Sequence, residues 1–148
     1  MFFIHINPTN FHKHIKKLNN IIANKKNKLF ILYYMEGCGP CNATRPEWNK
    51  IKSVTIPNSD NIYVVDIDQT LSSKLNGLTE PNSFPTMRFV TNGGKIVENY
   101  EDSSIEQKDR TIDSFVKWIK SKSKNMVGGK RTRRYKKRKT LKKNSTIL

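Results

Sequence analysis

The chain has 148 residues and a net charge of +16, from 28 Lys and Arg residues against 12 Asp and Glu residues. This length supports one domain with a single core and excludes a second catalytic domain. Residues 120–148 hold thirteen of the basic residues and no acidic residue, so only +3 belongs to residues 1–119. The sequence therefore predicts a domain over residues 1–122 and a disordered Lys/Arg-rich tail over residues 123–148.

Hydrophobic periodicity predicts alternating strands and helices in the first 119 residues. The expected strands are Phe2–Ile6, Leu29–Tyr34, Ile62–Ile67, Thr86–Val90 and Lys95–Tyr100, the last two joined by a turn at Asn92-Gly93-Gly94. The expected helices are Phe11–Ile22, Asn42–Ser53, a short one at Leu71–Leu75, and one that begins at Thr111. This βαβαβαββα order predicts an α/β fold in which helices cover both faces of a mixed β-sheet.

The first six residues are apolar, but Asn7 and the lysines after Phe11 end this run. It is much shorter than a signal-peptide core or a membrane span. We therefore expect a cytoplasmic chain without a signal peptide or a membrane span. Two cysteines in such a chain argue against a structural disulfide framework and favour redox or metal chemistry.

Both cysteines lie in Cys38-Gly39-Pro40-Cys41, where an expected strand passes into an expected helix. The free N–H groups and the dipole of a helix N-terminus stabilise an anion, which favours Cys38 as the attacking thiolate. Cys41 lies one turn further along and faces the protein, within reach of a disulfide to Cys38. Gly39 lets the backbone approach a partner chain, and Pro40 suits the first helical turn.

These features resemble the thioredoxin family. Cys38-Gly39-Pro40-Cys41 matches the motif of thioredoxins proper, and Ser83-Phe84-Pro85-Thr86 resembles the family's cis-proline loop. The segment Arg110–Ile119 is similar to the last helix of protein disulfide isomerase catalytic domains, although nine residues separate Tyr100 from Arg110, more than is usual. The resemblance implies a thioredoxin fold and reversible thiol–disulfide exchange through Cys38 and Cys41.

The resemblance also implies how substrates bind. The backbone of Phe84, beside a cis Pro85, would pair with an extended substrate segment. Gly37 replaces the tryptophan that is usual before the motif, which opens the rim of the site. The expected partners are protein disulfides and a separate reductase or thiol pool, the protein acts as a monomer, and no cofactor is needed.

Two departures from the family affect the mechanism. Leu32 occupies the position of the family's buried acid, and Val64 corresponds to the lysine that commonly pairs with that acid. An apolar pair thus replaces an ion pair, and Cys41 lacks a nearby base. Asp66 and Asp68 are interpreted as solvated residues at a strand end.

Two alternatives remain open. The first is a zinc half-site completed by His5, His12 and His14, although His12 and His14 are two residues apart on a helix and point to different faces. The second is a redox-inert scaffold whose basic tail is the active part. In that case the chain would be a binding protein for nucleic acid or another polyanion.

The basic tail follows Gly128-Gly129, and ten of the fourteen residues from Lys130 to Lys143 are Lys or Arg. This composition indicates a nuclear-localisation patch or a counter-ion for nucleic acid, an anionic membrane or an acidic partner. The candidate polyanion-binding residues are Lys130, Arg131, Arg133, Arg134, Lys136, Lys137, Arg138 and Lys139. The tail resembles those of proteins of large DNA viruses, which would imply a location in the host cytoplasm or the virion, with the nucleus as an alternative.

If the tail binds polyanions by neutralising about 6 to 10 phosphates, affinity should fall by roughly 10³ to 10⁵ between low and moderate salt. Truncation after Asn125 should abolish this binding and leave thiol exchange intact. Fluorescence anisotropy with labelled oligonucleotides over a salt series measures both effects. Tight binding that survives truncation, or that is insensitive to salt, would contradict the prediction.

Overall fold

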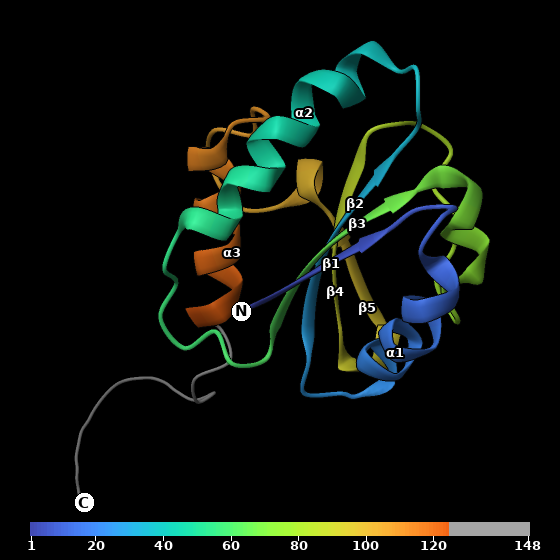
Figure 1. The fold of residues 1–148 in the computed structure, drawn as a ribbon. Coiled ribbons are helices and arrows are strands. Elements are labelled where there is room, and N and C mark those ends of the chain that lie inside the picture. The colour runs from blue at the N-terminus through green and yellow to red at the C-terminus, as the bar shows by residue number, and fades with distance from the viewer. Residues whose placement is uncertain (125–148) are drawn as a thin grey trace, which may run out of the picture. The chain divides into compact units, whose positions relative to one another are not determined.

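The computed structural model describes residues 1–124 and contains a five-stranded sheet (Figure 1). Its strands are β1 (Phe2–Ile6), β2 (Lys28–Tyr34), β3 (Ile62–Asp68), β4 (Thr86–Thr91) and β5 (Ile96–Asn99), in the spatial order β1-β3-β2-β4-β5. β3 runs parallel to both β1 and β2, whereas β4 is antiparallel to β2 and β5. The expected mixed sheet is confirmed, and β2 forms its centre.

The helices are α1 (Phe11–Ala23), α2 (Gly39–Asn49) and α3 (Ile112–Lys124). Short 3₁₀ segments are η1 (Lys50–Ser53), η2 (Gln69–Lys74), η3 (Asn92–Gly94) and η4 (Tyr100–Asp102). The helix expected over Asn42–Ser53 thus begins at Gly39 and passes into η1. The short helix expected at Leu71–Leu75 is the 3₁₀ segment η2. α2 and α3 lie on one face of the sheet, and α1 lies on the other (Figure 1).

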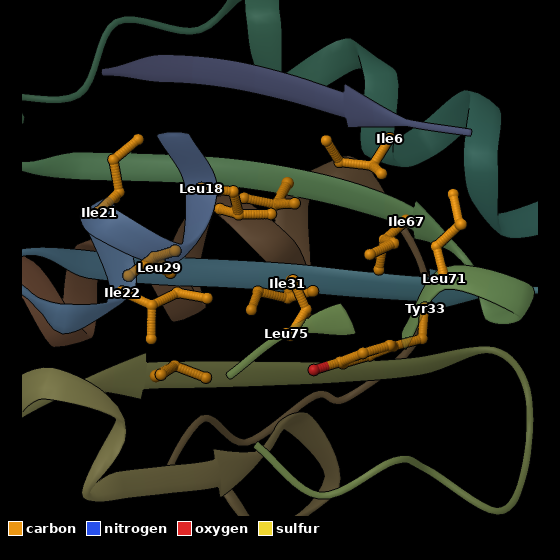
Figure 2. Packing of buried hydrophobic residues seen from close by; sticks show 12 residues of the cluster. Ile6, Leu18, Ile21, Ile22, Leu29, Ile31, Tyr33, Ile67, Leu71 and Leu75 are labelled. Carbon is orange, nitrogen blue, oxygen red and sulfur yellow. The ribbon is translucent and has the colours of Figure 1, made fainter. Parts of the chain in front are cut away.

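The face that carries α1 has an aliphatic core (Figure 2). Alternate residues of β2, namely Leu29, Ile31 and Tyr33, point to this face, as strand geometry requires. They pack with Leu18, Ile21 and Ile22 of α1 and with Leu71 and Leu75. The helical spacing of the α1 residues explains why the sequence predicted this helix correctly.

The face that carries α2 and α3 has an aromatic core. Phe30 of β2 lies with its ring centroid 5.0 Å from that of Trp118, and Trp48 of α2 lies 5.0 Å from Phe115. Tyr100 contacts the rings of Phe115 and Trp118 at 5.4 Å and 4.9 Å. Because such rings bury large areas, they hold the C-terminal end of α2 against α3, and α3 against β2. The cysteines lie at the opposite, N-terminal end of α2.

The eight candidate polyanion-binding residues between Lys130 and Lys139 lie outside the described residues. Within residues 1–124, no helix has the length and apolar character that a bilayer span needs.

Candidate active site

The two cysteines lie in the turn that joins β2 to α2. The chain leaves β2 at Tyr34 and turns through Gly37, whose φ of +76° favours glycine. Cys38 is the N-cap of α2, and its Sγ accepts a hydrogen bond of 3.2 Å from the backbone N–H of Cys41. Pro40, in the first turn, has no N–H to leave unpaired. The N-cap position that the sequence predicted for Cys38 is thus confirmed.

The two thiols differ in burial, and neither forms a disulfide. Cys38 is partly exposed, whereas Cys41 is 0% exposed. Burial raises the pKa of the Cys41 thiol to about 11, and the neighbouring Cys38 adds to this rise. A backbone hydrogen bond at Met35 and the positive charge of Arg110 act in the opposite direction on the same pKa. Cys41 is therefore shielded and protonated at neutral pH.

The cis-proline loop lies beside Cys38. The peptide bond between Phe84 and Pro85 is cis, the geometry that the sequence analysis expects. The Cys38 thiol donates a weak hydrogen bond of 3.8 Å to the carbonyl oxygen of Phe84. Residues 46 positions apart in the sequence are thereby brought together, and the Phe84 carbonyl lies next to the partly exposed sulfur.

An arginine that the sequence analysis missed holds the turn before Cys38. Arg45 of α2 places its guanidinium 3.7 Å from the ring centroid of Tyr34, at the end of β2. The same guanidinium forms an ion pair of 3.4 Å with Glu36, two residues before Cys38. These contacts link the turn to the helix that follows it. The signal in the sequence was Arg45, one helical turn after Cys41, together with Glu36, nine residues before that arginine.

Leu32 and Val64 are buried on the face that carries α2, with exposures of 0% and 3%. The two positions are therefore apolar and buried in the structure. The interpretation of Asp66 and Asp68 as solvated residues was wrong, because they are only 6% and 4% exposed. Asp68 caps η2 through hydrogen bonds from the backbone and side chain of Thr70.

Asp66 is stabilised by a partner from another strand. It lies opposite Leu32 in the β2–β3 register and opposite His5 in the β1–β3 register. The Nδ1 atom of His5 forms a hydrogen bond with a carboxylate oxygen of Asp66. Asp66 is thus a buried carboxylate on the same face of the sheet as Leu32. It lies on β3, the strand next to β2, where Leu32 occupies the position of the family's buried acid.

The zinc alternative required histidines near the cysteines. His5 is instead bonded to Asp66, and residues 1–124 contain no group of three or more His, Cys, Asp or Glu residues that could hold a metal ion. The cysteine pair consists of a partly exposed thiol at a helix N-terminus and a second, buried thiol one turn away.

Comparison with known proteins agrees with this geometry. The chain is 28% identical over 103 residues to a protein disulfide-isomerase of Datisca glomerata, and 26% identical over 114 residues to one of Oryctolagus cuniculus. These matches cover 68% and 76% of this chain but only 19% and 21% of those proteins. The chain thus spans about a fifth of the length of these curated relatives.

A solved structure of similar fold is the first thioredoxin domain of mouse protein disulfide-isomerase A4. It has a TM-score of 0.52 and 28% sequence identity, over 80% of this chain and 74% of that one. The sequence profile of the thioredoxin family matches residues 3–121. The chain therefore belongs to the thioredoxin family.

Proposed function

We propose that this protein is a thiol–disulfide oxidoreductase that exchanges electrons with protein disulfides through Cys38 and Cys41. The observation that carries the proposal is the unequal setting of the two thiols. Cys38 is partly exposed at the N-terminus of α2, 3.8 Å from the Phe84 carbonyl, and Cys41 is buried. One thiol can reach a substrate, and the other can react only with its neighbour.

In the first step, the Cys38 thiolate attacks one sulfur of a substrate disulfide. A bond forms between Cys38 and that sulfur, the substrate S–S bond breaks, and the other substrate sulfur leaves as a thiolate that takes up a proton. The N–H of Cys41, which donates to the Cys38 sulfur, stabilises its negative charge before the attack. The dipole at the start of α2 acts in the same direction.

In the second step, Cys41 loses its proton and attacks the Cys38 sulfur. The Cys38–Cys41 disulfide forms, and the second substrate sulfur leaves as a thiol once it is protonated. Two electrons and two protons have then passed from the enzyme to the substrate. A reductant must return them before another cycle. The motif shared with thioredoxins proper favours the reducing direction.

The substrate is held by backbone pairing in this proposal. The carbonyl of Phe84 lies beside the Cys38 sulfur, so an extended segment that carries the target cystine can bond to the backbone there. Gly37 is exposed and has no side chain to cover the rim. The site therefore accepts polypeptides with varied residues around the cystine.

The role assignment predicts different behaviour for two serine variants. Cys41→Ser should trap a mixed disulfide through Cys38, because no thiol remains to resolve it. Cys38→Ser should form no adduct, because its remaining thiol is buried. Incubation with a protein disulfide, followed by mass spectrometry, measures the adducts. Alkylation with and without reduction, together with reduction of the same substrate, checks the wild-type cycle.

Equal trapping by both variants would contradict the assignment of roles. A wild-type protein that cannot cycle between dithiol and disulfide would remove the oxidoreductase proposal altogether.

The raised pKa of Cys41 predicts a pH-dependent second step. With a pKa of about 11, roughly one Cys41 in 10⁴ is a thiolate at pH 7, and this fraction rises about tenfold for each pH unit. Burial, the largest cause of the raised pKa of Cys41, also acts in the mixed disulfide, so single-turnover release of substrate should accelerate as the pH rises, by up to tenfold for each pH unit. Stopped-flow or quench measurements over pH 6 to 10 determine the slope.

Leu32→Asp would place a base at the position that the family uses, and it should accelerate release at pH 7 by about 10² to 10⁴. Because Asp66 lies opposite residue 32 in the β2–β3 register, the new carboxylate of the Leu32→Asp variant should repel that of Asp66 and lower the free energy of unfolding. Adding Val64→Lys should recover part of the lost free energy of unfolding. Leu32→Asn is the matched control, with similar shape and no base. Fast, pH-independent release in the wild type would show that another group, such as Asp66, already serves as the base.

A further inference from the structure

A second hollow lies between helix α1 and β1, which is an edge strand of the sheet. Its volume is about 270 Å³, just below the usual range for sites that bind small molecules. We call it the β1–α1 pocket, and its lining residues are Phe3, Ile4, His5, Asn10, His14 and Lys17. These residues belong neither to the cysteine turn nor to the cis-proline loop, so the pocket is separate from the candidate active site.

The charged side chains of the β1–α1 pocket are basic. His14 and Lys17 are three residues apart and therefore lie on one face of α1. Neither forms a hydrogen bond or an ion pair with another described residue. The lining residues include no Asp or Glu, and the first 35 residues of the sequence contain none either. The positive charge of the pocket is therefore not compensated by its own lining, which favours an anion as ligand.

The start of α1 adds to this preference. Asn10 is the N-cap of α1, but its side chain does not cap the helix. It accepts a hydrogen bond of 2.9 Å from the N–H of Asn7 and donates one of 2.8 Å to the carbonyl of His5. The first turn of α1 also holds no acidic residue. The partial positive charge of this helix end is thus not offset by a side chain, and it acts in the same direction as the lysine.

His5 contributes a nitrogen atom that lacks a partner. Its Nδ1 forms a hydrogen bond with Asp66, whereas its Nε2 is buried and has no hydrogen-bond partner among the described residues. Buried polar atoms in folded proteins usually have such a partner. An imidazole that is protonated on both nitrogens can donate to Asp66 through one and to an anion through the other. His5 is therefore a third donor at the wall of the pocket.

This lining selects among anions. A phosphate monoester carries close to two negative charges at pH 7 and three terminal oxygens, so it can accept from His5, His14 and Lys17 together. A carboxylate carries a single charge and two oxygens. Phe3 and Ile4 form an apolar wall, which suits an organic group attached to the phosphate. Nucleic-acid phosphates are diesters with one charge each, and a duplex is too wide to enter a hollow of this volume.

We propose that the β1–α1 pocket binds a small soluble phosphate monoester. His5, His14 and Lys17 hold the phosphate group, and the organic part lies against the apolar wall. This inference goes beyond the proposed function and does not rest on it, because neither cysteine takes part in the binding. The ligand also differs from the polyanions expected for the basic tail, both in size and in the charge that each phosphate carries.

A two-dimensional ¹H–¹⁵N NMR titration of the full-length protein tests the inference. The probes are phenyl phosphate, inorganic phosphate, which lacks the ring, and benzoate, which keeps the ring but has a single charge. A phosphoserine peptide distinguishes a protein-bound phosphate from a free one. With phenyl phosphate, the amide signals of the pocket residues should shift together and saturate. Its Kd should be about tenfold lower than that of either small comparator, which corresponds to one good contact.

Variants then locate the site. Lys17→Gln should raise the Kd of phenyl phosphate by about tenfold, because a charge-assisted contact is lost, and Lys17→Arg should keep most of the affinity. His14→Gln should raise the Kd in the same direction. Lys16→Gln is the matched control, because it removes the same charge from an exposed neighbour on α1 that does not line the pocket. It should change the Kd by less than about twofold. Cys41→Ser should bind phenyl phosphate as the wild type does.

Shifts that do not saturate, or equal losses of affinity in Lys16→Gln and Lys17→Gln, would show only a diffuse attraction of anions to α1 and would overturn the inference. Binding of benzoate or inorganic phosphate as tight as that of phenyl phosphate would overturn the assignment of the ligand as a phosphate monoester. Tighter binding of the phosphoserine peptide would overturn the assignment to a small molecule. The oxidoreductase proposal is tested through the cysteines and stands or falls separately.

Discussion

The structure depends on the turn by which β2 passes into α2. β2 is the buried central strand of the sheet, and Trp48 of α2 is held against Phe115 of α3. Cys38 is the N-cap of α2, so its sulfur lies at the helix N-terminus, where the N–H of Cys41 donates to it. Cys41, one turn further along α2, is buried. The chemical difference between two identical side chains therefore follows from their place in one turn.

The apolar pair formed by Leu32 and Val64 favours the stability of the core at the expense of the rate at which Cys41 resolves the mixed disulfide. It spares the protein an ion pair in the core, where desolvation offsets much of the attraction between the charges. It also leaves the Cys41 thiol without a carboxylate at the family's position. The chain keeps a buried carboxylate nearby in Asp66, but it is engaged by His5 on β1. The resolving step should therefore be the slow one.

Much of the fold and the core of the site could be predicted from sequence because their signals are local. The spacing of Leu18 and Ile22 predicts α1, and the position of Cys38 after an apolar run predicts its N-cap role. The burial of Asp66 was missed because its partner is 61 residues away and meets it only through the β1–β3 pairing. A polar pocket of about 390 Å³ that Thr86 and Arg110 help to line was missed for the same reason, since these residues converge only in the fold.

The central claim is that Cys38 is the reactive thiol and Cys41 is shielded. Its most direct test is the rate at which iodoacetamide modifies each cysteine of the reduced protein, resolved by peptide mass spectrometry at several pH values. The account predicts that Cys38 reacts quickly at neutral pH, whereas Cys41 stays unmodified until the pH approaches 11, where its thiol ionises. Equal rates for the two cysteines at neutral pH, or faster modification of Cys41, would contradict it.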